Sequence, residues 1–334
     1  MDPEKQYPEH HHHHHHHHHR RKRMMMKVIW SVIGILVVVA LIFVGMAWRN
    51  VRVATNTMYS PTGMKTDLPK KLQAKKPINV LLLGTDTGAL GRDYKGRTDT
   101  IMMMVVNPKQ HKTTIVSLPR DMKVNLPGYE DESPAKINAA YTYGGVQETI
   151  KTIQKYYKTP VDGYLLVNMG GMEKAINQVG GVTVKSPLTF TYEGYSFTKN
   201  ATYHMNGKKA LAFSRMRYDD PQGDYGRQNR QRLVIMALLK KTASYKTILN
   251  QSFLNSIASQ SQTDFSLNDM LKVAKNYRGS TQMVKQDHAQ GRSQMIDGQS
   301  FEVVPSDEMQ RISNEVRSAL GLSTVKRDLL VRNI

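Results

Sequence analysis

Residues 28–48 limit what this chain can be more than any other stretch of its sequence. The run VIWSVIGILVVVALIFVGMAW carries no charged side chain, and roughly 20 apolar residues in a helix are enough to cross the hydrocarbon core of a membrane. A cleaved signal peptide is the alternative, but its apolar region is usually about 7–15 residues long and ends at a small-residue cleavage site, which is not clean here. We therefore expect one uncleaved transmembrane helix at 28–48.

The charges on either side of this run predict its orientation. More cations precede this run than follow it closely. Those before it are Arg20, Arg21, Lys22, Arg23 and Lys27, and those after it are Arg49, Arg52 and the more distant Lys65. An excess of Lys and Arg marks the cytoplasmic side of a membrane helix. We therefore expect residues 1–27 to form a cytoplasmic tail and the chain after residue 48 to lie outside the cell. The histidine run at 10–19 is either a purification tag or a natural low-complexity tail, and it is left out of the fold assignment.

Length and composition favour one large domain after the anchor. The chain has 334 residues and is 40% hydrophobic, which is enough for a single substantial core. It has no cysteine, and this excludes a disulfide framework, thiolate chemistry and cysteine-ligated zinc. Residues 49–76 contain Pro61, Gly63 and Pro69 and show no sustained period, so we expect a stalk there and one domain at 77–334.

The part of the chain beyond the anchor is strongly basic. Of the 47 Lys and Arg residues 40 follow Arg49, against 24 of the 27 Asp and Glu residues, which leaves a net charge of about +16. Nucleic acid is the usual partner of such a surface, but the predicted topology places this charge outside the cell. We therefore expect phosphorylated lipids and anionic wall polymers as partners, and no nucleic acid.

Three buried strands are predicted near the start of the domain, at 78–83, 101–106 and 113–118. If they pair as an antiparallel meander, the end of the first, the start of the second and the end of the third meet at one edge. Asp86, Asp99, Arg120 and Asp121 would then lie together. Converging carboxylates suit magnesium, which is commonly held by one or two of them together with substrate phosphates. The alternative is that Asp86 and Asp99 merely end strands, because aspartate favours turns.

The rest of the pattern alternates between helices and strands. Helices are predicted at 145–157 and 171–179, strands at 163–167 and 182–184, and a hairpin at 190–198. Further helices are expected at 267–277 and 307–320 around a strand at 301–304. The predicted fold class is therefore α/β in three layers, α-β-α, with a central mixed, largely antiparallel sheet flanked by helices and preceded by the single transmembrane helix.

Arginines crowd the stretch SRMRYDDPQGDYGRQNRQR at 214–232. Arg215 and Arg217 would share one side of an extended segment, and a helix beginning near Asp224 would carry Arg227 and Gln231 on a face that becomes apolar further along. Buried guanidinium groups need an anion, so the pattern favours a pyrophosphate cradle at a helix start. A solvated charged face and an internal salt-bridge network with nearby aspartates are the alternatives.

Six segments stand out together by their order, spacing and residue types. They are LLLGTD at 81–86, GRTDT at 96–100, SLPRDMKV at 117–124, KINAAYTYGG at 136–145, SRMRYDD at 214–220 and DYGRQNRQR at 224–232. Together they resemble one family of bacterial envelope proteins, the LytR-CpsA-Psr family, over residues 78–245, with a looser fit toward the carboxyl terminus.

The resemblance implies an anchored phosphotransferase. Such proteins move an anionic glycopolymer, such as wall teichoic acid or capsule, from an undecaprenyl-pyrophosphate carrier to peptidoglycan, with the lipid tail in an apolar tunnel. Asp86 and Asp99 match the carboxylates associated with magnesium, for which manganese is a substitute, and either one is the candidate base that acts with Arg120. The matching positions for pyrophosphate binding are Arg97, Arg120, Lys136, Arg215, Arg217, Arg227 and Gln231.

Two other classes of function stay open at this point. One is a membrane-anchored regulator that binds the polyprenyl pyrophosphate or polymer in the same basic pocket without turnover. The other is a hydrolase that releases lipid phosphate with water as the acceptor. The sequence does not identify the glycopolymer, and residues 250–334 carry no recognisable chemistry.

Overall fold

The computed structural model describes residues 17–85, 96–242 and 250–326, and for 17–36, Phe43 and Gln251 it describes the backbone alone. The chain divides into two compact units, Met1–Asn50 and Val51–Ile334. Helix α1 (His17–Met58) supplies the described part of the first unit. Its segment Val37–Met58, with a mean hydropathy of 1.7, is the one helix in the described ranges that is long and apolar enough to cross a membrane.

A six-stranded mixed sheet forms the centre of the second unit, in the order β11-β6-β1-β2-β3-β12. The strands are β1 (Ile78–Thr85), β2 (Thr98–Asn107), β3 (Lys112–Ser117), β6 (Gly163–Asn168), β11 (Ser261–Thr263) and β12 (Met283–His288). β1, β2 and β3 pair as the predicted antiparallel meander. β6 and β12 run parallel to β1 and β3. The predicted fold class is therefore confirmed.

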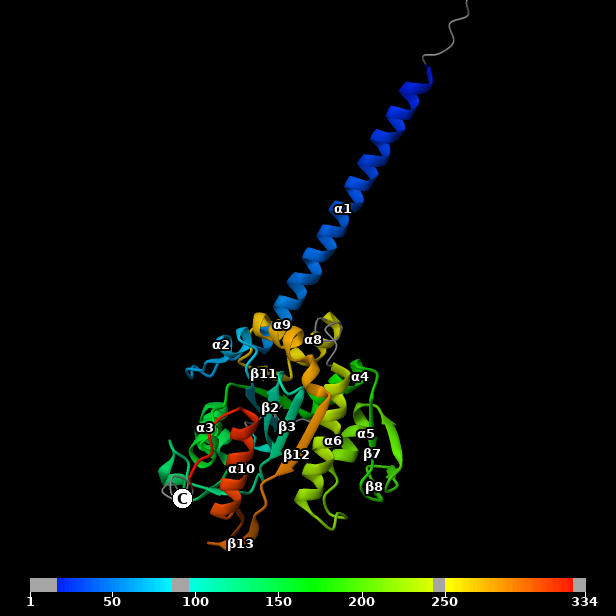
Figure 1. The fold of residues 1–334 in the computed structure, drawn as a ribbon. Coiled ribbons are helices and arrows are strands. Elements are labelled where there is room, and N and C mark those ends of the chain that lie inside the picture. The colour runs from blue at the N-terminus through cyan, green and yellow to red at the C-terminus, as the bar shows by residue number, and fades with distance from the viewer. Residues whose placement is uncertain (1–16, 86–95, 243–249, 327–334) are drawn as a thin grey trace, which may run out of the picture. The chain divides into compact units, whose positions relative to one another are not determined.

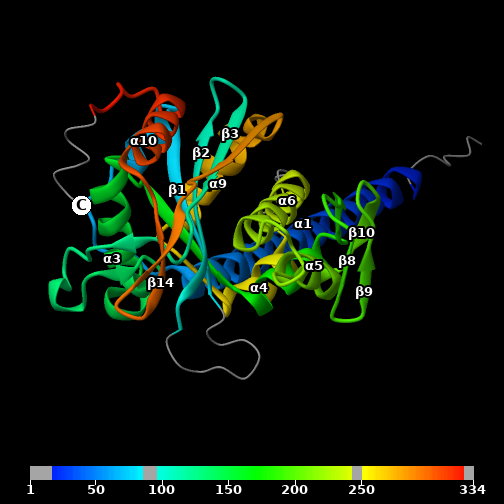
Figure 2. The same ribbon diagram turned by 90° about the horizontal axis from the view of Figure 1, so that it is seen from below.

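Helices cover both faces of this sheet (Figure 1 and Figure 2). α3 (Ala139–Tyr157) and α10 (Ser306–Ala319) pack against the face that carries Leu81 and Met103. α2 (Leu68–Gln73), α9 (Leu267–Asn276) and α6 (Asp224–Thr242) lie on the face that carries Leu82 and Met102. Two covered faces explain why β1 is apolar at nearly every position rather than at every second one.

A smaller lobe packs around its own aromatic core beside the sheet. It contains α4 (Met169–Gln178), α5 (Gly207–Arg215), β7 (Val182–Lys185), β8 (Phe190–Tyr192), β9 (Tyr195–Phe197) and β10 (Thr202–Met205). The predicted hairpin at 190–198 is confirmed, with Glu193 and Gly194 both at positive φ in its turn. The remaining elements are β4 (Lys123–Val124), β5 (Ala135–Lys136), α8 (Gln251–Ala258), β13 (Arg292–Ile296), β14 (Gln299–Val303) and the 3-10 turns Glu130–Glu132 and Arg278–Thr281.

Residues 49–76 are packed rather than extended as a stalk. Val51, Ala54 and Met58 are buried in a cluster with Leu254 and Ala258 of α8. The next segment buries α2 on the sheet, and Ser60 N donates to the Thr263 carbonyl at 2.8 Å. The spacing of the three buried residues on α1 is helical, but it merges with the apolar run before it, and this conceals the start of the domain in the sequence.

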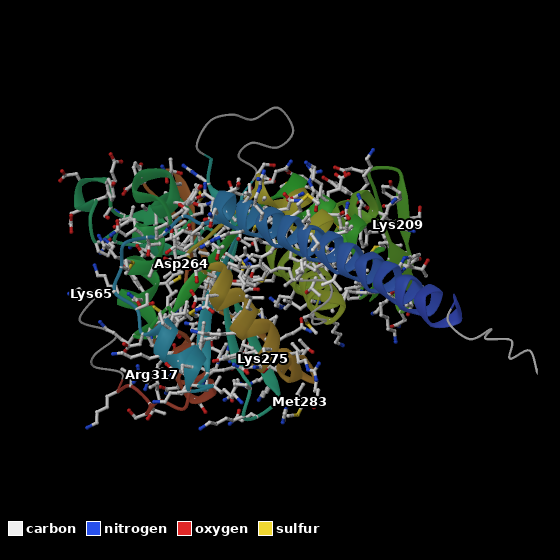
Figure 3. The ribbon with its side chains drawn as sticks, turned by 90° about the horizontal axis from the view of Figure 1, so that it is seen from above. Lys65, Lys209, Asp264, Lys275, Met283 and Arg317 are labelled. Atoms are coloured by element: carbon white, nitrogen blue, oxygen red, sulfur yellow. The ribbon has the colours of Figure 1, made fainter. Side chains whose placement is uncertain are left out.

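Asp264, which follows β11, gives the domain a specific pH dependence (Figure 3). Its carboxylate accepts the Tyr164 N–H at 2.8 Å, and burial raises its pKa to about 6. The pKa of Asp264 is higher in the folded state than in the unfolded state. Its contribution to the free energy of unfolding is therefore fully present below about pH 4 and is lost as the pH rises through about 6. Asp264→Asn keeps the acceptor and removes the titration. We expect urea unfolding of the wild type to lose about 2 kcal/mol relative to this variant between pH 4 and 7, and parallel pH profiles would contradict the assignment.

Candidate active site

The edge where β1 ends and β2 begins brings the first predicted residues together. Thr85 pairs with Thr98 across β1 and β2, and Leu118 N donates to the Ile101 carbonyl at 2.9 Å where β3 ends. Asp99 lies at the start of β2 and forms an ion pair with Arg120, 21 residues further along the chain. The meander therefore places these two side chains as the sequence predicts.

Arg120 is the centre of a cluster of three carboxylates. Besides Asp99, its Nε lies 3.6 Å from Asp121 Oδ2 and 3.8 Å from Asp224 Oδ1. Burial lowers the pKa of Arg120, but the charges of Asp99, Asp224 and Asp121 together more than offset it and raise that pKa. Lys136 on β5 joins the cluster, with its Nζ 3.0 Å from Asp121 Oδ1. The cluster fixes the direction of a permanently charged guanidinium.

Arg227 brings a second guanidinium to this cluster from the first turns of α6. The helix begins at Asp224, as predicted, and Arg227 Nη2 lies 2.6 Å from Asp224 Oδ1. The residue is only 8% exposed, and within the described part of the chain its Nε has no hydrogen-bond partner. Burial lowers the pKa of Arg227, Asp224 raises it, and the nearby charges of Arg120 and Arg217 lower it further. A buried cation facing two others is suited to an anionic ligand.

Gln231 lies one turn beyond Arg227 on α6, and its buried amide oxygen has no hydrogen-bond partner among the described residues. Gln228 has a similarly buried, unpartnered amide oxygen and is a position that the sequence analysis missed. Unsatisfied buried polar groups are uncommon in native proteins. Their concentration along the first two turns of α6 makes this helix face the candidate ligand-binding surface.

Arg215 does not join this surface. We predicted an extended segment that carries Arg215 and Arg217 on one side, but α5 continues through Arg215 and ends there. The Arg215 guanidinium pairs instead with Glu193 Oε1 in the β8–β9 turn, at 3.1 Å. Arg217 lies in the following loop, and its charge acts on Arg227. Arg97 is exposed just before β2, where its carbonyl accepts the Thr85 hydroxyl at 3.3 Å.

Arg230 forms an internal salt bridge with a nearby aspartate, which was one of the alternatives for the arginine-rich stretch. Its side chain is fully buried and forms an ion pair with Asp220. Its Nε donates to the Phe213 carbonyl at 3.0 Å, and Nη2 donates to the Met216 carbonyl. These bonds hold the end of α5 and the next loop on α6. The arginine-rich stretch thus holds both a guanidinium whose bonds are internal, that of Arg230, and one with an unsatisfied buried donor, that of Arg227.

Two further contacts join α6 to β14 and to β3, and the sequence analysis predicted neither. Tyr225 donates to Glu302 Oε1 at 2.7 Å, and Glu302 N in turn donates to the Asp121 carbonyl at 2.8 Å. Arg232 Nη1 donates to the Ser117 hydroxyl at 2.8 Å, and burial lowers the pKa of Arg232 to about 10. The partners are 77 and 115 residues apart, so no local pattern indicates them.

Of the two predicted magnesium ligands, only Asp99 lies within the described residues, and Asp86 lies outside them. Within the described ranges there is no group of three or more acidic, His or Cys side chains that could hold a metal ion. Asp99 and Asp224 remain as oxygen donors, and each already faces a guanidinium. This set fits a magnesium ion that arrives with phosphate ligands, and it does not fit an all-protein cage.

Comparison with known proteins identifies the group to which this arrangement belongs. The sequence model of the LytR_cpsA_psr family matches residues 46–318. The Enterococcus faecalis polyisoprenyl-teichoic acid–peptidoglycan teichoic acid transferase TagU is 39% identical over 88% of this chain and 98% of its own. The Biofilm regulatory protein A of Streptococcus mutans is 35% identical over 74% of this chain and 65% of its own.

A solved structure agrees with these two sequences. The crystal structure of Bacillus subtilis TagU is 33% identical, with a TM-score of 0.60 over 75% of this chain and all of its own. The resemblance inferred from the six motifs is confirmed, since the matched region contains the sheet, the carboxylate cluster around Arg120 and the first turns of α6. The chain belongs to the LytR_cpsA_psr family.

Proposed function

We propose that the protein is a membrane-anchored phosphotransferase that moves an anionic glycopolymer such as wall teichoic acid from a polyprenyl-pyrophosphate carrier to peptidoglycan. The observation that carries this proposal is the buried guanidinium of Arg227, which lies close to Arg120 and whose Nε lacks a hydrogen-bond partner in the described part of the chain. The names of the E. faecalis and B. subtilis relatives support the same substrates.

In the reaction, Arg120 and Arg227 neutralise the pyrophosphate while the acceptor hydroxyl attacks the phosphorus that carries the polymer. A new bond forms between the acceptor oxygen and this phosphorus, and the bond from phosphorus to the bridging oxygen breaks, which leaves the lipid monophosphate. The acceptor proton passes to a carboxylate, and Asp99 is the candidate because Arg120 holds it in place. Phosphoryl transfer of this kind depends on positioning and charge stabilisation and needs no covalent enzyme intermediate.

Asp99 together with Asp86 would hold magnesium, or manganese in its place, which would neutralise further phosphate charge. We expect Asp99→Ala to lower the transfer rate at least ~100-fold while the melting temperature stays close to wild type, because the side chain is partly exposed and serves the ligand. Asp131→Ala, at an exposed position, is the matched control. Chelation should abolish transfer and added magnesium should restore it; full activity in excess chelator would remove the metal from the mechanism.

The orientation of the anchor belongs to the same proposal. An apolar helix near the amino terminus fits single-pass anchoring, and the cations before residue 28 favour a cytoplasmic tail. The active domain would then act outside the cell, where peptidoglycan is assembled. Protease added to intact, wall-stripped cells should digest the domain and spare the histidine-bearing tail, and protection of the domain would contradict this topology.

A regulator that binds without turnover is the second candidate, because the S. mutans relative carries a regulatory name. Both candidates use the Arg227 surface and differ only in the fate of the ligand. The full-length protein incubated with lipid-linked polymer and peptidoglycan should release lipid monophosphate as polymer becomes attached. Tight donor binding with neither product would favour the regulator.

A further inference from the structure

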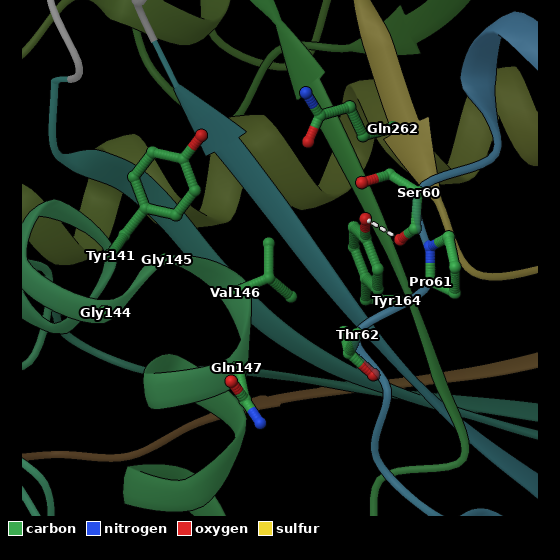
Figure 4. Close-up of a pocket in the computed structure, with 10 residues that line it drawn as sticks. All are labelled: Ser60, Pro61, Thr62, Tyr141, Gly144, Gly145, Val146, Gln147, Tyr164 and Gln262. Atoms are coloured by element: carbon green, nitrogen blue, oxygen red, sulfur yellow. Dashed lines mark hydrogen bonds between the residues drawn. The ribbon is translucent and has the colours of Figure 1, made fainter.

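A pocket of about 370 Å³ lies beside α3 and has no arginine in its lining (Figure 4). One wall comes from the chain after α1 and from β11, and the opposite wall from the start of α3. The lining residues are Ser60, Pro61, Thr62, Tyr141, Gly144, Gly145, Val146, Gln147, Tyr164 and Gln262. Its volume falls within the range of small-molecule binding sites.

The chemistry of this pocket selects a neutral ligand. Among the described residues that line it, none carries a charge. Burial raises the pKa of both Tyr141 and Tyr164, so their hydroxyl groups stay protonated at physiological pH. Hydroxyl and amide groups beside two aromatic rings offer hydrogen bonds together with apolar surface. A neutral, polyhydroxylated saccharide has this combination, whereas a phosphate-rich polymer does not.

A break in α3 opens the pocket. Gly145 has φ of 66° and ψ of −157° and interrupts the helix between Tyr141 and Gln147. A positive φ of this kind is open to glycine and costly for most other residues. In Figure 4 the rings of Tyr141 and Tyr164 lie on either side of Val146, and Tyr164 donates to the Ser60 carbonyl at 2.6 Å. The kink therefore lies in the wall of the cavity.

The pocket lies within reach of the transfer centre. Tyr164 pairs with Leu81, four positions before the level of Thr85, which pairs with Thr98 next to Asp99. At about 3.3 Å per residue, the floor of the pocket is set back by about 13 Å from the strand ends. Along the other wall, Thr142 donates to the Gly96 carbonyl at 3.2 Å, and Asn138 N donates to the Arg120 carbonyl at 3.2 Å. A short oligosaccharide spans that separation.

The pocket lies on the α3 face of the sheet, because Tyr141 and Tyr164 belong to the core there, whereas the later turns of α6 pack on the other face with Ile235 and Leu239. The start of α6 meets Arg120 at the strand ends. In phosphoryl transfer the attacking and leaving oxygens lie roughly in line on opposite sides of phosphorus. The start of α3 adjoins this centre, since Asn138 N donates to the Arg120 carbonyl, so an acceptor held beside α3 has its hydroxyl group on that side of the pyrophosphate.

From this arrangement we infer that the pocket binds neutral sugar residues of the acceptor glycan and presents their hydroxyl group to the transfer centre. The inference rests on the proposed transferase function and adds the acceptor's binding site to it. Sugars of the lipid-linked donor share the same chemistry, so the experiment separates the two sources.

The test fills the pocket from an exposed position. Gln262→Trp blocks it, and Gln178→Trp, at an exposed position on α4, is the matched control. With full-length protein in detergent, saturation-transfer NMR should detect binding of chitotetraose to the wild type and the control, and at least a ~10-fold loss in Gln262→Trp at an unchanged melting temperature. The KM for the peptidoglycan acceptor should rise by a similar factor, with the donor KM and the kcat at saturating acceptor unchanged.

Each other outcome has one meaning. A rise in the donor KM instead would assign the pocket to the donor's sugars and overturn the inference. Absence of chitotetraose binding by the wild type would also overturn it. If the wild type binds chitotetraose and Gln262→Trp does not, but the wild type shows no transfer at all, the proposed function is contradicted and the saccharide site still stands. Gln262→Ala, which cannot crowd β11, should show a smaller shift in the same direction.

Discussion

Arg230→Ala will lower the free energy of unfolding by about 3–5 kcal/mol. The substitution removes a fully buried guanidinium and strands the carboxylate of Asp220, whose side chain is only 5% exposed. It also frees the carbonyls of Phe213 and Met216. Urea unfolding measures the loss. Arg230→Lys keeps the charge without the fork and should lose less, which gives a second reading if the alanine variant does not fold.

A double variant separates the lost contact from the stranded charge. Arg230→Met combined with Asp220→Leu replaces the buried pair by apolar groups of similar size and should recover most of the stability. A wild-type unfolding curve for Arg230→Ala would show that this arginine is not structural. In that case the division of the arginine-rich stretch between structure and binding would be wrong.

Arg227→Ala, three positions earlier on the same helix, should have the opposite effect. Each charge-assisted contact contributes about 1.5–3 kcal/mol, so affinity for a polyprenyl pyrophosphate should fall roughly 10- to 100-fold. The melting temperature should change little or rise, because Arg120 and Arg217 lose a neighbour of like charge. Arg227→Lys should rescue binding only in part, since it lacks the planar fork.

Equilibrium binding and thermal melting on the same samples distinguish these roles. A large fall in the melting temperature of Arg227→Ala with unchanged affinity would falsify the cradle. It would mean that the 2.6 Å pair with Asp224 is the main role of this residue. The two variants are controls for each other, because they remove the same side chain from neighbouring turns of α6.

The sequence predicts the Asp99–Arg120 pair because only short loops join the strands that bring the two residues together. Three adjacent apolar runs joined by loops favour a meander, and a meander brings their ends together. The same logic fails at Arg215, because the end of α5 depends on Arg230 reaching back to Phe213 and Met216. A helix boundary set by a tertiary contact leaves no local signal.

Burial divides the arginines of 214–232 in a way that spacing does not. Arg227 and Arg230 are both buried and both lie close to an aspartate, yet only Arg230 also donates to the backbone carbonyls of the preceding loop. Charge alone predicts that anions meet both groups. Which anion is internal depends on where Asp220 lies after folding, and nothing in a one-dimensional pattern determines that.

The bond between Tyr225 and Glu302 also concerns the order in which the protein becomes competent. The chain leaves the ribosome with its amino terminus first, and the carboxylate that holds Tyr225 emerges 77 residues after it. β12 and α10, which complete the sheet and its core, also follow α6 in the chain. Contacts over such sequence separations form slowly. A partly synthesised chain can therefore hold Asp99 and Arg120 on its first strands without an assembled centre, and the centre is complete only after Glu302 has emerged.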